Sequence, residues 1–308
     1  MTAKAIVVSD LAKNYGPLKA VDRVSFSVDA GEIFGFLGPN GAGKTTTLRM
    51  LTGIIRPDGG TASILGHDVV RDNLAAKQVR GVVPEMSNAY VDLTAWKNLL
   101  LTGELYGIPK KLTEERSERL LRQFGLYEKK DRAVKGYSKG MKQRLIICMA
   151  LVSQPPLLFL DEPTSGLDVE SSRLIKDIVR EVNKSGTTVF LTTHNMEEAS
   201  QLCDRVAIID RGKIVAVDSP EKLKAKSKEL QSIEVSFDRP IDLGGLAMAD
   251  VSKTEKAGDK YRIYTGNPDA VIKRLAGFAE EKGLRIVTLN LLAPSLEDVF
   301  VELTGKGR

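Results

Sequence analysis

The chain has 308 residues, a hydrophobic content of 42% and a formal net charge of +5 from 45 basic and 40 acidic residues. This length and composition predict a globular protein with one large domain and one small domain. No stretch reaches the roughly 18 uncharged apolar residues of a membrane span, and the apolar run near the N-terminus is too short for a secretory signal, so we expect a soluble, intracellular protein. Lys and Glu are interspersed, which favours a solvated surface over a nucleic-acid-binding patch.

Short apolar runs alternate with helical patterns through the first two thirds of the chain. Antiparallel strands are predicted first, in AIVVSDL and VDRVSFSVDAGE, with a turn at Gly31. Five buried strands are predicted next, in IFGFLG, RGVVPE, LLFLDEP, TTVFLTTH and RVAIID. The segment between RGVVPE and YSKGMKQR has helical periodicity and predicts a helical subdomain over about residues 86–153. The expected fold class is therefore α/β, with a parallel sheet, a β-rich flank and a helical subdomain.

A domain boundary is predicted after the hairpin IIDRGKIVAV, where SPEKLKAKSKELQS is polar and rich in Lys. This predicts a large domain over 1–218, followed by a linker and a small α+β domain over 219–308. Strands are expected in SIEVSF, KYRIYT and RIVTLNLL, with a helix from about Pro268 to Lys282. The end of the chain predicts a docked terminal helix with Ser295 as its N-cap and one apolar face formed by Leu296, Val299, Phe300 and Leu303.

The sequence GPNGAGKT, from Gly38 to Thr45, matches the phosphate-loop pattern GxxxxGK(S/T) between an apolar strand and a helix. Its glycines let backbone amides turn inward around phosphates, and the helix N-terminus adds a favourable dipole. We expect Lys44 to neutralise the β and γ phosphates and Thr45 to ligate Mg²⁺. The predicted nucleotide-binding residues of this loop are Gly38, Pro39, Asn40, Gly41, Ala42, Gly43, Lys44, Thr45 and Thr46.

Two adjacent acids, Asp161 and Glu162, end the apolar run LLFLDEP. In a parallel sheet this strand end lies beside a phosphate loop. One carboxylate there can hold Mg²⁺ through water, and the next can polarise an attacking water, so Asp161 is a predicted metal ligand and Glu162 a predicted catalytic residue. Adjacent acids at a strand end are also common as solvated loop residues.

The segment YSKGMKQR, Tyr137 to Arg144, precedes an apolar helix. Ser138 is a natural N-cap, and Gly140 can bring its amide close to a ligand, which together make a second anion-binding helix terminus. The phosphate loop already serves one side of a triphosphate, so we expect Ser138 and Gly140 to act on the nucleotide held by a facing subunit. The alternative is a capped helix without a ligand.

Together these residues resemble the ATP-binding cassette (ABC) family of P-loop NTPases, over roughly residues 3 to 218. In that family the order is phosphate loop, LSGGQ-type signature, acid pair, SGLD-type loop and a switch histidine. The matching residues here are the Ser165–Asp168 loop, SGLD, and His194 after TTVFLTT. The resemblance implies that His194 contacts the γ-phosphate, and that Asp168 aligns the opposite subunit.

The resemblance also assigns roles to Tyr15 and Glu85. Tyr15 matches the aromatic residue that stacks on adenine, with a core tyrosine as the alternative. Glu85 stands where the family usually has a glutamine, which implies a metal ligand whose carboxylate would bind Mg²⁺ more strongly and repel the γ-phosphate. The signature also departs from the common pattern, with Lys139 and Met141 in place of glycine and glutamine.

These departures, and the closing PSLEDVFVELTG, resemble the ATPase subunits of the ABC-2 type exporter branch, although an ordinary docking helix would explain the closing residues too. The resemblance implies an ATP-hydrolysing subunit, with ATP and Mg²⁺ as cofactors, that forms a homodimer around two ATP molecules. It further implies a separately encoded polytopic permease, contacted around Ala89 to Leu105 with Tyr90, Trp96 and Leu100 as candidates, and a location on the cytoplasmic face of the cell membrane.

Two other functions explain part of the pattern. A soluble, non-transport cassette ATPase acting on ribosomes or nucleic acid usually carries two cassettes or a long coiled coil, whereas this sequence has one phosphate loop and no sustained heptads. A P-loop kinase would leave the Ser138 segment and His194 unexplained. We therefore expect a transport ATPase that does not act on nucleic acid.

Overall fold

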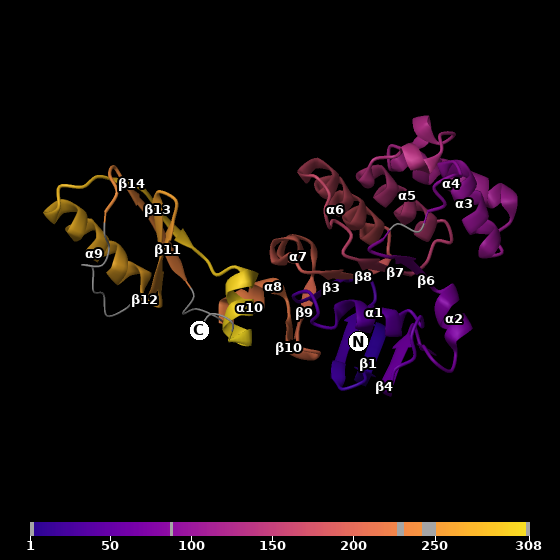
Figure 1. The fold of residues 1–308 in the computed structure, drawn as a ribbon, viewed down its shortest axis with the longest axis horizontal. Coiled ribbons are helices and arrows are strands. Elements are labelled where there is room, and N and C mark those ends of the chain that lie inside the picture. The colour runs from indigo at the N-terminus through magenta and orange to yellow at the C-terminus, as the bar shows by residue number, and fades with distance from the viewer. Residues whose placement is uncertain (1–2, 87–88, 227–230, 242–250, 306–308) are drawn as a thin grey trace. The chain divides into compact units, whose positions relative to one another are not determined.

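The computed structural model describes residues 3–86, 89–226, 231–241 and 251–305. The chain divides into two compact units, Met1–Asp218 and Ser219–Arg308 (Figure 1). Among the described residues, no helix combines the length and the apolar character that crossing a bilayer requires.

A six-stranded sheet forms the centre of the first unit, in the order β10–β9–β3–β8–β7–β6. The strands are β3 (Ile33–Leu37), β6 (Arg80–Val83), β7 (Leu157–Asp161), β8 (Thr188–Thr193), β9 (Arg205–Asp210) and β10 (Lys213–Asp218). Five strands are parallel, and β10 pairs antiparallel with β9 at one edge. Every residue of β3, β7 and β8 is buried, which explains why their sequences are unbroken apolar runs. The five predicted parallel strands are confirmed.

A four-stranded antiparallel sheet, in the order β2–β1–β4–β5, forms the predicted β-rich flank. Its strands are β1 (Lys4–Tyr15), β2 (Leu18–Asp29), β4 (Gly59–Ile64) and β5 (His67–Asp68). Helix α1 (Lys44–Leu51) contacts strands of both sheets and lies between them (Figure 1), and the short α2 (Asn73–Gln78) follows β5. The sequence did not predict β4, because GGTASI begins with two glycines and has little apolar alternation.

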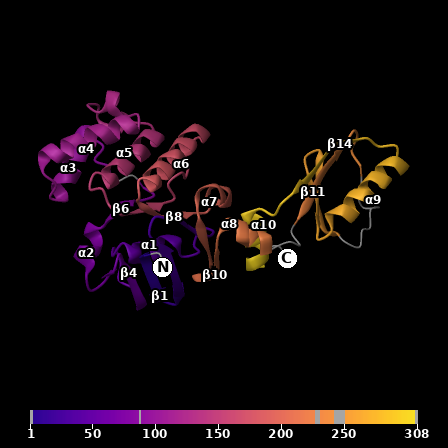
Figure 2. The same cartoon turned by 180° about the vertical axis from the view of Figure 1, so that it is seen from behind.

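Helices cover the other face of the six-stranded sheet (Figure 2). Those between β6 and β7 are α3 (Ala95–Leu105), α4 (Lys110–Gln123) and α5 (Lys139–Leu151), with 3₁₀ turns η1 (Tyr127–Lys129) and η2 (Val134–Gly136). These α-helices contact one another, and they are followed in the chain by α6 (Val169–Lys184) and α7 (Met196–Leu202). Side chains cap four of them at the N-terminus, which fixes where each helix begins: Thr94, Ser138, Asp168 and Asn195.

Five phenylalanines pack together at the centre of the first unit. The ring of Phe190 in β8 lies 5.4–6.0 Å, centroid to centroid, from four others, and the members of this aromatic cluster are Phe26, Phe34, Phe36, Phe159 and Phe190. Four of these residues come from β3, β7 and β8, the strands whose ends carry the predicted site. The cluster therefore fixes the relative positions of these strand ends.

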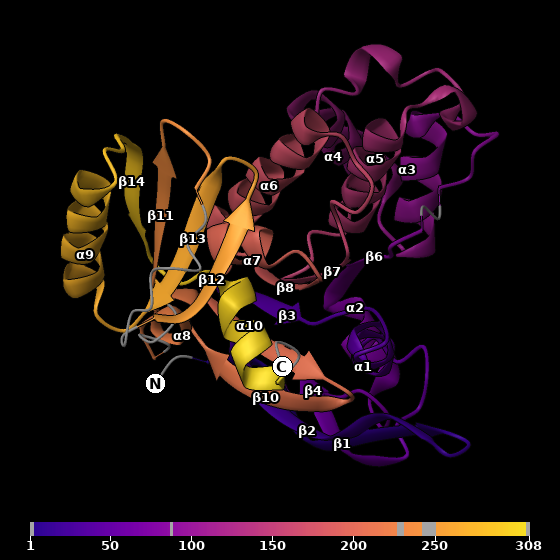
Figure 3. The ribbon, with the colours of Figure 1, turned by 60° about the vertical axis from the view of Figure 1, so that its left-hand side comes forward.

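The second unit contains a four-stranded antiparallel sheet, in the order β12–β13–β11–β14, with one helix against it (Figure 3). Its elements are α8 (Pro220–Lys226), β11 (Ser232–Phe237), β12 (Val251–Ala257), β13 (Lys260–Thr265), α9 (Pro268–Glu281), β14 (Ile286–Leu292) and α10 (Leu296–Thr304). The buried face of the sheet packs on α9 through a core that includes Ile233, Val235, Ile263 and Leu275. The sequence did not predict β12, because VSKTEKA is polar and largely exposed.

The terminal helix α10 has the predicted N-cap. Ser295 and Asp298 form a reciprocal capping box, and Asp298 also pairs with Arg262 of β13 at 3.1 Å. The helix contacts α8. Leu296, Val299 and Phe300 on its predicted apolar face are buried, whereas Leu303 is 42% exposed. Leu303 lies in the last turn, where the helix ends.

Replacing Phe190 with Ala tests the aromatic cluster. The substitution removes a fully buried ring, so we expect the free energy of unfolding of the first unit to fall by about 3–5 kcal/mol. The matched control is Phe237→Ala, which removes a buried ring from the second unit. Scanning calorimetry should resolve two transitions, each lowered by one variant only. A single transition lowered by both variants would show that the two units do not unfold independently.

Candidate functional site

The loop between β3 and α1 is shaped by glycines that no other residue can replace without strain. Gly41 and Gly43 have φ of 80° and 109°, a region that favours glycine. A Cβ atom at Gly38 would lie 2.3 Å from the carbonyl oxygen of Ile209, and one at Gly43 would lie 2.5 Å from that of Ala20. The loop therefore packs directly on neighbouring backbone, with the N-terminus of α1 at its end.

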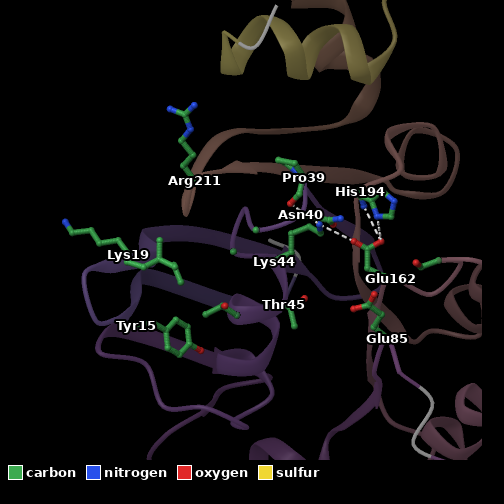
Figure 4. Close-up of a pocket in the computed structure, with 16 residues that line it drawn as sticks. Tyr15, Lys19, Pro39, Asn40, Lys44, Thr45, Glu85, Glu162, His194 and Arg211 are labelled. Carbon is green, nitrogen blue, oxygen red and sulfur yellow. Dashed lines mark hydrogen bonds and ion pairs between the residues drawn. The ribbon is translucent and has the colours of Figure 1, made fainter.

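A pocket of about 560 Å³ opens at this loop (Figure 4). It brings together most of the predicted nucleotide, metal and catalytic residues: Tyr15, Pro39, Asn40, Gly41, Gly43, Lys44, Thr45, Thr46, Glu85, Glu162 and His194. Three residues of the predicted nucleotide and metal sites do not line it. Gly38 packs against the backbone of Ile209, and Ala42 is buried within the loop. Asp161 is buried at the end of β7.

Lys44 is nearly enclosed by the loop and by Glu162. Its ammonium group donates to the carbonyl oxygen of Gly38 at 2.7 Å and lies 3.1 Å from the Glu162 carboxylate. Only 5% of its side chain is exposed, so little water reaches this charge. A phosphate that binds Lys44 must therefore compete with Glu162 for the ammonium group.

Glu162 also contacts His194, through its second carboxylate oxygen (Figure 4). That oxygen lies 2.8 Å from Nδ1 of His194 and accepts the His194 backbone N–H at 3.3 Å. The backbone of Glu162 is in the left-handed region, with φ of 48°. Strain of this kind persists where surrounding contacts hold it, and here the Glu162 N–H donates to the Thr192 carbonyl at 3.1 Å. The side chain is thereby directed between Lys44 and His194.

Asp161 is buried and accepts a hydrogen bond from the Thr192 hydroxyl. Burial raises the pKa of Asp161, the neighbouring Glu162 charge raises it further, and the Thr192 hydroxyl acts in the opposite direction. The ionised carboxylate would be stabilised by a cation, which fits a metal ligand. Within the described parts of the chain, no group of three His, Cys, Asp or Glu side chains could by itself hold a metal ion.

Tyr15 and Glu85 reach the pocket from opposite directions (Figure 4). Tyr15 ends β1 and is 48% exposed, so it is not a core residue. Its ring is available to stack on a flat ligand. Glu85 is exposed and follows β6, and it faces the pocket on the side of Glu162 and Thr45.

Ser138, Gly140 and Asp168 form a second group that does not line this pocket. Ser138 caps α5, and a Cβ atom at Gly140 would lie only 2.5 Å from the hydroxyl of Ser171 in α6. Asp168 caps α6 by accepting from the Ser171 N–H and hydroxyl, each at 2.8 Å, and these bonds lower the pKa of its exposed carboxyl group. The structure thus joins the starts of α5 and α6 at one exposed place, which we name the Ser138 cluster.

Five residues that line the pocket were not predicted from the sequence: Leu18, Lys19, Ala20, Ser165 and Arg211. The β1–β2 register pairs Asn14 with Lys19, so the hairpin turn at Gly16 could have placed Lys19 beside Tyr15. Ser165 lies between two predicted site residues in the chain. Arg211 lies in the turn between β9 and β10, and only the order of strands across the sheet brings it to the loop.

Comparison of the sequence with known proteins gives matches over nearly the whole chain. The ABC transporter family profile matches residues 21–165. Nod factor export ATP-binding protein I of Rhizobium sp. (strain N33) is 40% identical over 307 residues, covering 99% of both chains. Daunorubicin/doxorubicin resistance ATP-binding protein DrrA of Streptomyces peucetius is 38% identical over 306 residues, covering 98% of this chain and 93% of the relative.

Solved structures match part of the chain. An ATP-binding subunit of an ABC transporter is 31% identical, with a TM-score of 0.66, over 72% of this chain and 92% of the other. An ATP-binding cassette of an ABC transporter in its ADP conformation is 26% identical, with a TM-score of 0.65, over 72% of this chain and 93% of the other. With a full-length relative at 40% identity and the phosphate loop, Glu162 and His194 in one pocket, the chain belongs to the ABC transporter family and is an ATP-binding, ATP-hydrolysing member of it.

Proposed function

We propose that this chain is the ATP-hydrolysing subunit of an exporter and that it drives a separate membrane permease. The observation that carries the ATPase function is the contact of Glu162 with both Lys44 and His194 at the phosphate loop. The export function is supported by the similar full-length proteins, which are named for Nod factor export and for daunorubicin/doxorubicin resistance.

In this proposal the first unit, residues 1–218, is the nucleotide-binding domain, and residues 219–308 are a linker and an accessory domain. ATP is held by the phosphate loop, with Lys44 on the β and γ phosphates. Adenine stacks on Tyr15, and such stacking contributes about 1–3 kcal/mol per base. Thr45, Asp161 and Glu85 would hold Mg²⁺, which neutralises charge that develops on the phosphates.

Hydrolysis follows from the position of Glu162. When the γ-phosphate takes Lys44, the Glu162 carboxylate is released from its ion pair and can accept a proton from water. The water oxygen bonds to the γ-phosphorus, the bond to the ADP oxygen breaks, and the products are ADP and inorganic phosphate. His194, 2.8 Å from Glu162, contacts the γ-phosphate and orients the carboxylate.

The Ser138 cluster supplies the argument for a dimer. Ser138 and Asp168 are exposed and lie outside the pocket of their own chain, although the start of α5 offers anion-binding amides. In a two-fold homodimer, the Ser138 cluster of each copy faces the phosphate loop of the other, and both sites are completed at once. ATP favours the closed dimer because its γ-phosphate contacts both copies, and hydrolysis removes that contact.

The permease would contact the exposed apolar side chains of residues 89–105 at the cytoplasmic face of the cell membrane. Tyr90 and Leu105 are 56% and 73% exposed and suit this role. Trp96 and Leu100 are half-buried, and the ammonium of Lys130 lies 5.4 Å from the Trp96 ring centroid, which favours a packing role for Trp96.

Glu162→Gln tests the catalytic assignment. We expect turnover to fall at least about 100-fold, because the amide cannot accept the proton. ATP affinity should rise about tenfold, because the amide competes less strongly for Lys44. With ATP and Mg²⁺, the variant should elute as a dimer in size exclusion, whereas Glu181→Gln, an exposed control on α6, should behave as the unaltered chain. A monomer at saturating ATP would contradict the dimer.

Mixing two inactive variants tests whether Ser138 acts on the partner's nucleotide. Lys44→Ala and Ser138→Arg should each be inactive alone. An equal mixture should recover roughly a quarter of the normal rate, since half of the dimers are mixed and each has one intact site. In the control, the Ser138→Arg chain is replaced by a chain that carries both substitutions. Mixed dimers of this chain with the Lys44→Ala chain have no intact site. Recovery no greater than in this control would overturn the assignment.

Purification from native membranes tests the permease. The tagged Glu162→Gln chain with ATP should recover a polytopic membrane protein, because the ATP-bound state is retained. Tyr90→Glu with Leu105→Glu should reduce this recovery, and Val287→Glu, a 59% exposed position on the second unit, serves as the control. Ribosomes or nucleic acid in place of a membrane protein would instead support a non-transport ATPase.

A further inference from the structure

A buried carboxylate lies behind the catalytic pair and takes no part in the mechanism above. Glu198, in the first turn of α7, is 3% exposed. Both of its carboxylate oxygens accept hydrogen bonds from threonine hydroxyls, from Thr164 at 2.8 Å and from Thr193 at 2.9 Å. Glu198 does not line the 560 Å³ pocket, so it does not touch a nucleotide bound there.

The two threonines belong to the segments that present the catalytic residues. Thr164 lies two residues after Glu162, and Thr193 lies immediately before His194. The Ser165 N–H donates to the Glu162 carbonyl at 3.1 Å, and the Leu167 N–H donates to the Thr164 carbonyl at 3.2 Å. The position of Thr164 therefore determines the path of the loop from Glu162 towards Asp168.

The turn that contains His194 is also held by hydrogen bonds. The Thr193 hydroxyl accepts the Asn195 N–H at 3.0 Å, and the Asn195 side chain accepts the Glu198 N–H at 2.9 Å. Glu198 thus holds the turn that contains His194 from both its backbone and its side chain. The carboxylate is a single group shared by the Glu162 loop and the His194 turn.

Stability alone would not favour a glutamate at this buried position. Burial raises the pKa of Glu198, and the Glu162 charge raises it further. The two threonine hydroxyls and Lys176 lower it. A buried ionic group is often less stable than a well-packed apolar residue of similar volume. A leucine at this position would fill similar space but could not bond the two threonines.

We propose that Glu198 is a positioning residue for ATP hydrolysis, which fixes Glu162 relative to His194 by joining the segments that carry them. This inference rests on the proposed ATPase function of the site. Catalytic groups must be held within about 0.5 Å of their working positions, and a misplacement of about 1 Å can reduce a rate about 100-fold. The carboxylate supplies this constraint from outside the pocket.

Three substitutions separate positioning from general stability. Glu198→Leu removes both acceptors, Thr164→Val removes the bond to the Glu162 loop, and Glu198→Gln keeps both contacts, because its amide can accept from one hydroxyl and donate to the other. Steady-state ATP hydrolysis with Mg²⁺, measured well below each unfolding midpoint, should show kcat about 10- to 100-fold lower for Glu198→Leu, with KM for ATP changed less than about twofold. Thr164→Val should lower kcat in the same way but less, and Glu198→Gln should keep most of kcat.

Two controls make the result specific. Glu32→Gln alters another buried glutamate of the same unit, at the start of β3 and away from the pocket, and should leave kcat unchanged even where it lowers the unfolding midpoint. In the Glu162→Gln background, Glu198→Leu should lower the residual rate no further, because the residue it positions is already inactive.

The inference is overturned if Glu198→Leu and Thr164→Val unfold at lower temperature but keep normal kcat, or if Glu198→Gln loses as much kcat as Glu198→Leu. If neither the unaltered chain nor Glu32→Gln hydrolyses ATP, the proposed function itself is overturned.

Discussion

The register of three adjacent parallel strands determines where the chemistry of this protein lies. β8 is hydrogen-bonded to β3 on one side and β7 on the other, and Thr193 pairs with Leu37 while Thr192 pairs with Asp161. Because the strands are parallel and in this register, their carboxyl ends meet at one edge of the sheet. The phosphate loop, Glu162 and His194 follow these ends directly, and Asp161 is the last residue of β7. A slip of one residue in β8 would turn its buried side chains to the other face and separate Glu162 from His194.

Lys44 has two alternative anionic partners, the Glu162 carboxylate and a phosphate of a bound nucleotide. Lys44 and Glu162 have side chains that are 5% and 9% exposed, and the Lys44 ammonium lies 3.1 Å from the Glu162 carboxylate. A buried charge cannot be left without a partner at low cost, so Lys44 can leave Glu162 only for another anion. In the proposed mechanism, exchange of the carboxylate for a phosphate would both bind the nucleotide and release the base that acts on it. Nucleotide binding and activation of the base would then be linked through a single ion pair.

Much of this could be predicted from the sequence, and the exceptions have physical causes. The phosphate loop and the five parallel strands were predictable because their signals are local: a glycine pattern and unbroken apolar runs. Lys19 and Arg211 were missed because they reach the pocket through strand pairing, which no local pattern encodes. Glu198 was missed for another reason: next to Glu197, in the first turn of a short helix, it reads as an ordinary dipole partner. Its burial is a property of the fold.

The loop from Glu162 to Asp168 connects two functions that the proposed dimer needs at the same time. At its start, Glu162 lines the pocket of its own chain, and at its end Asp168 belongs to the Ser138 cluster, which in the proposed dimer would face the partner. Between them, Thr164 is bonded to the buried Glu198. Movement at the Asp168 end would reach Glu162 through the Leu167–Thr164 and Ser165–Glu162 backbone hydrogen bonds. Closure around the partner's nucleotide would therefore change the position of Glu162. In the proposed dimer, one site would in this way affect catalysis at the other.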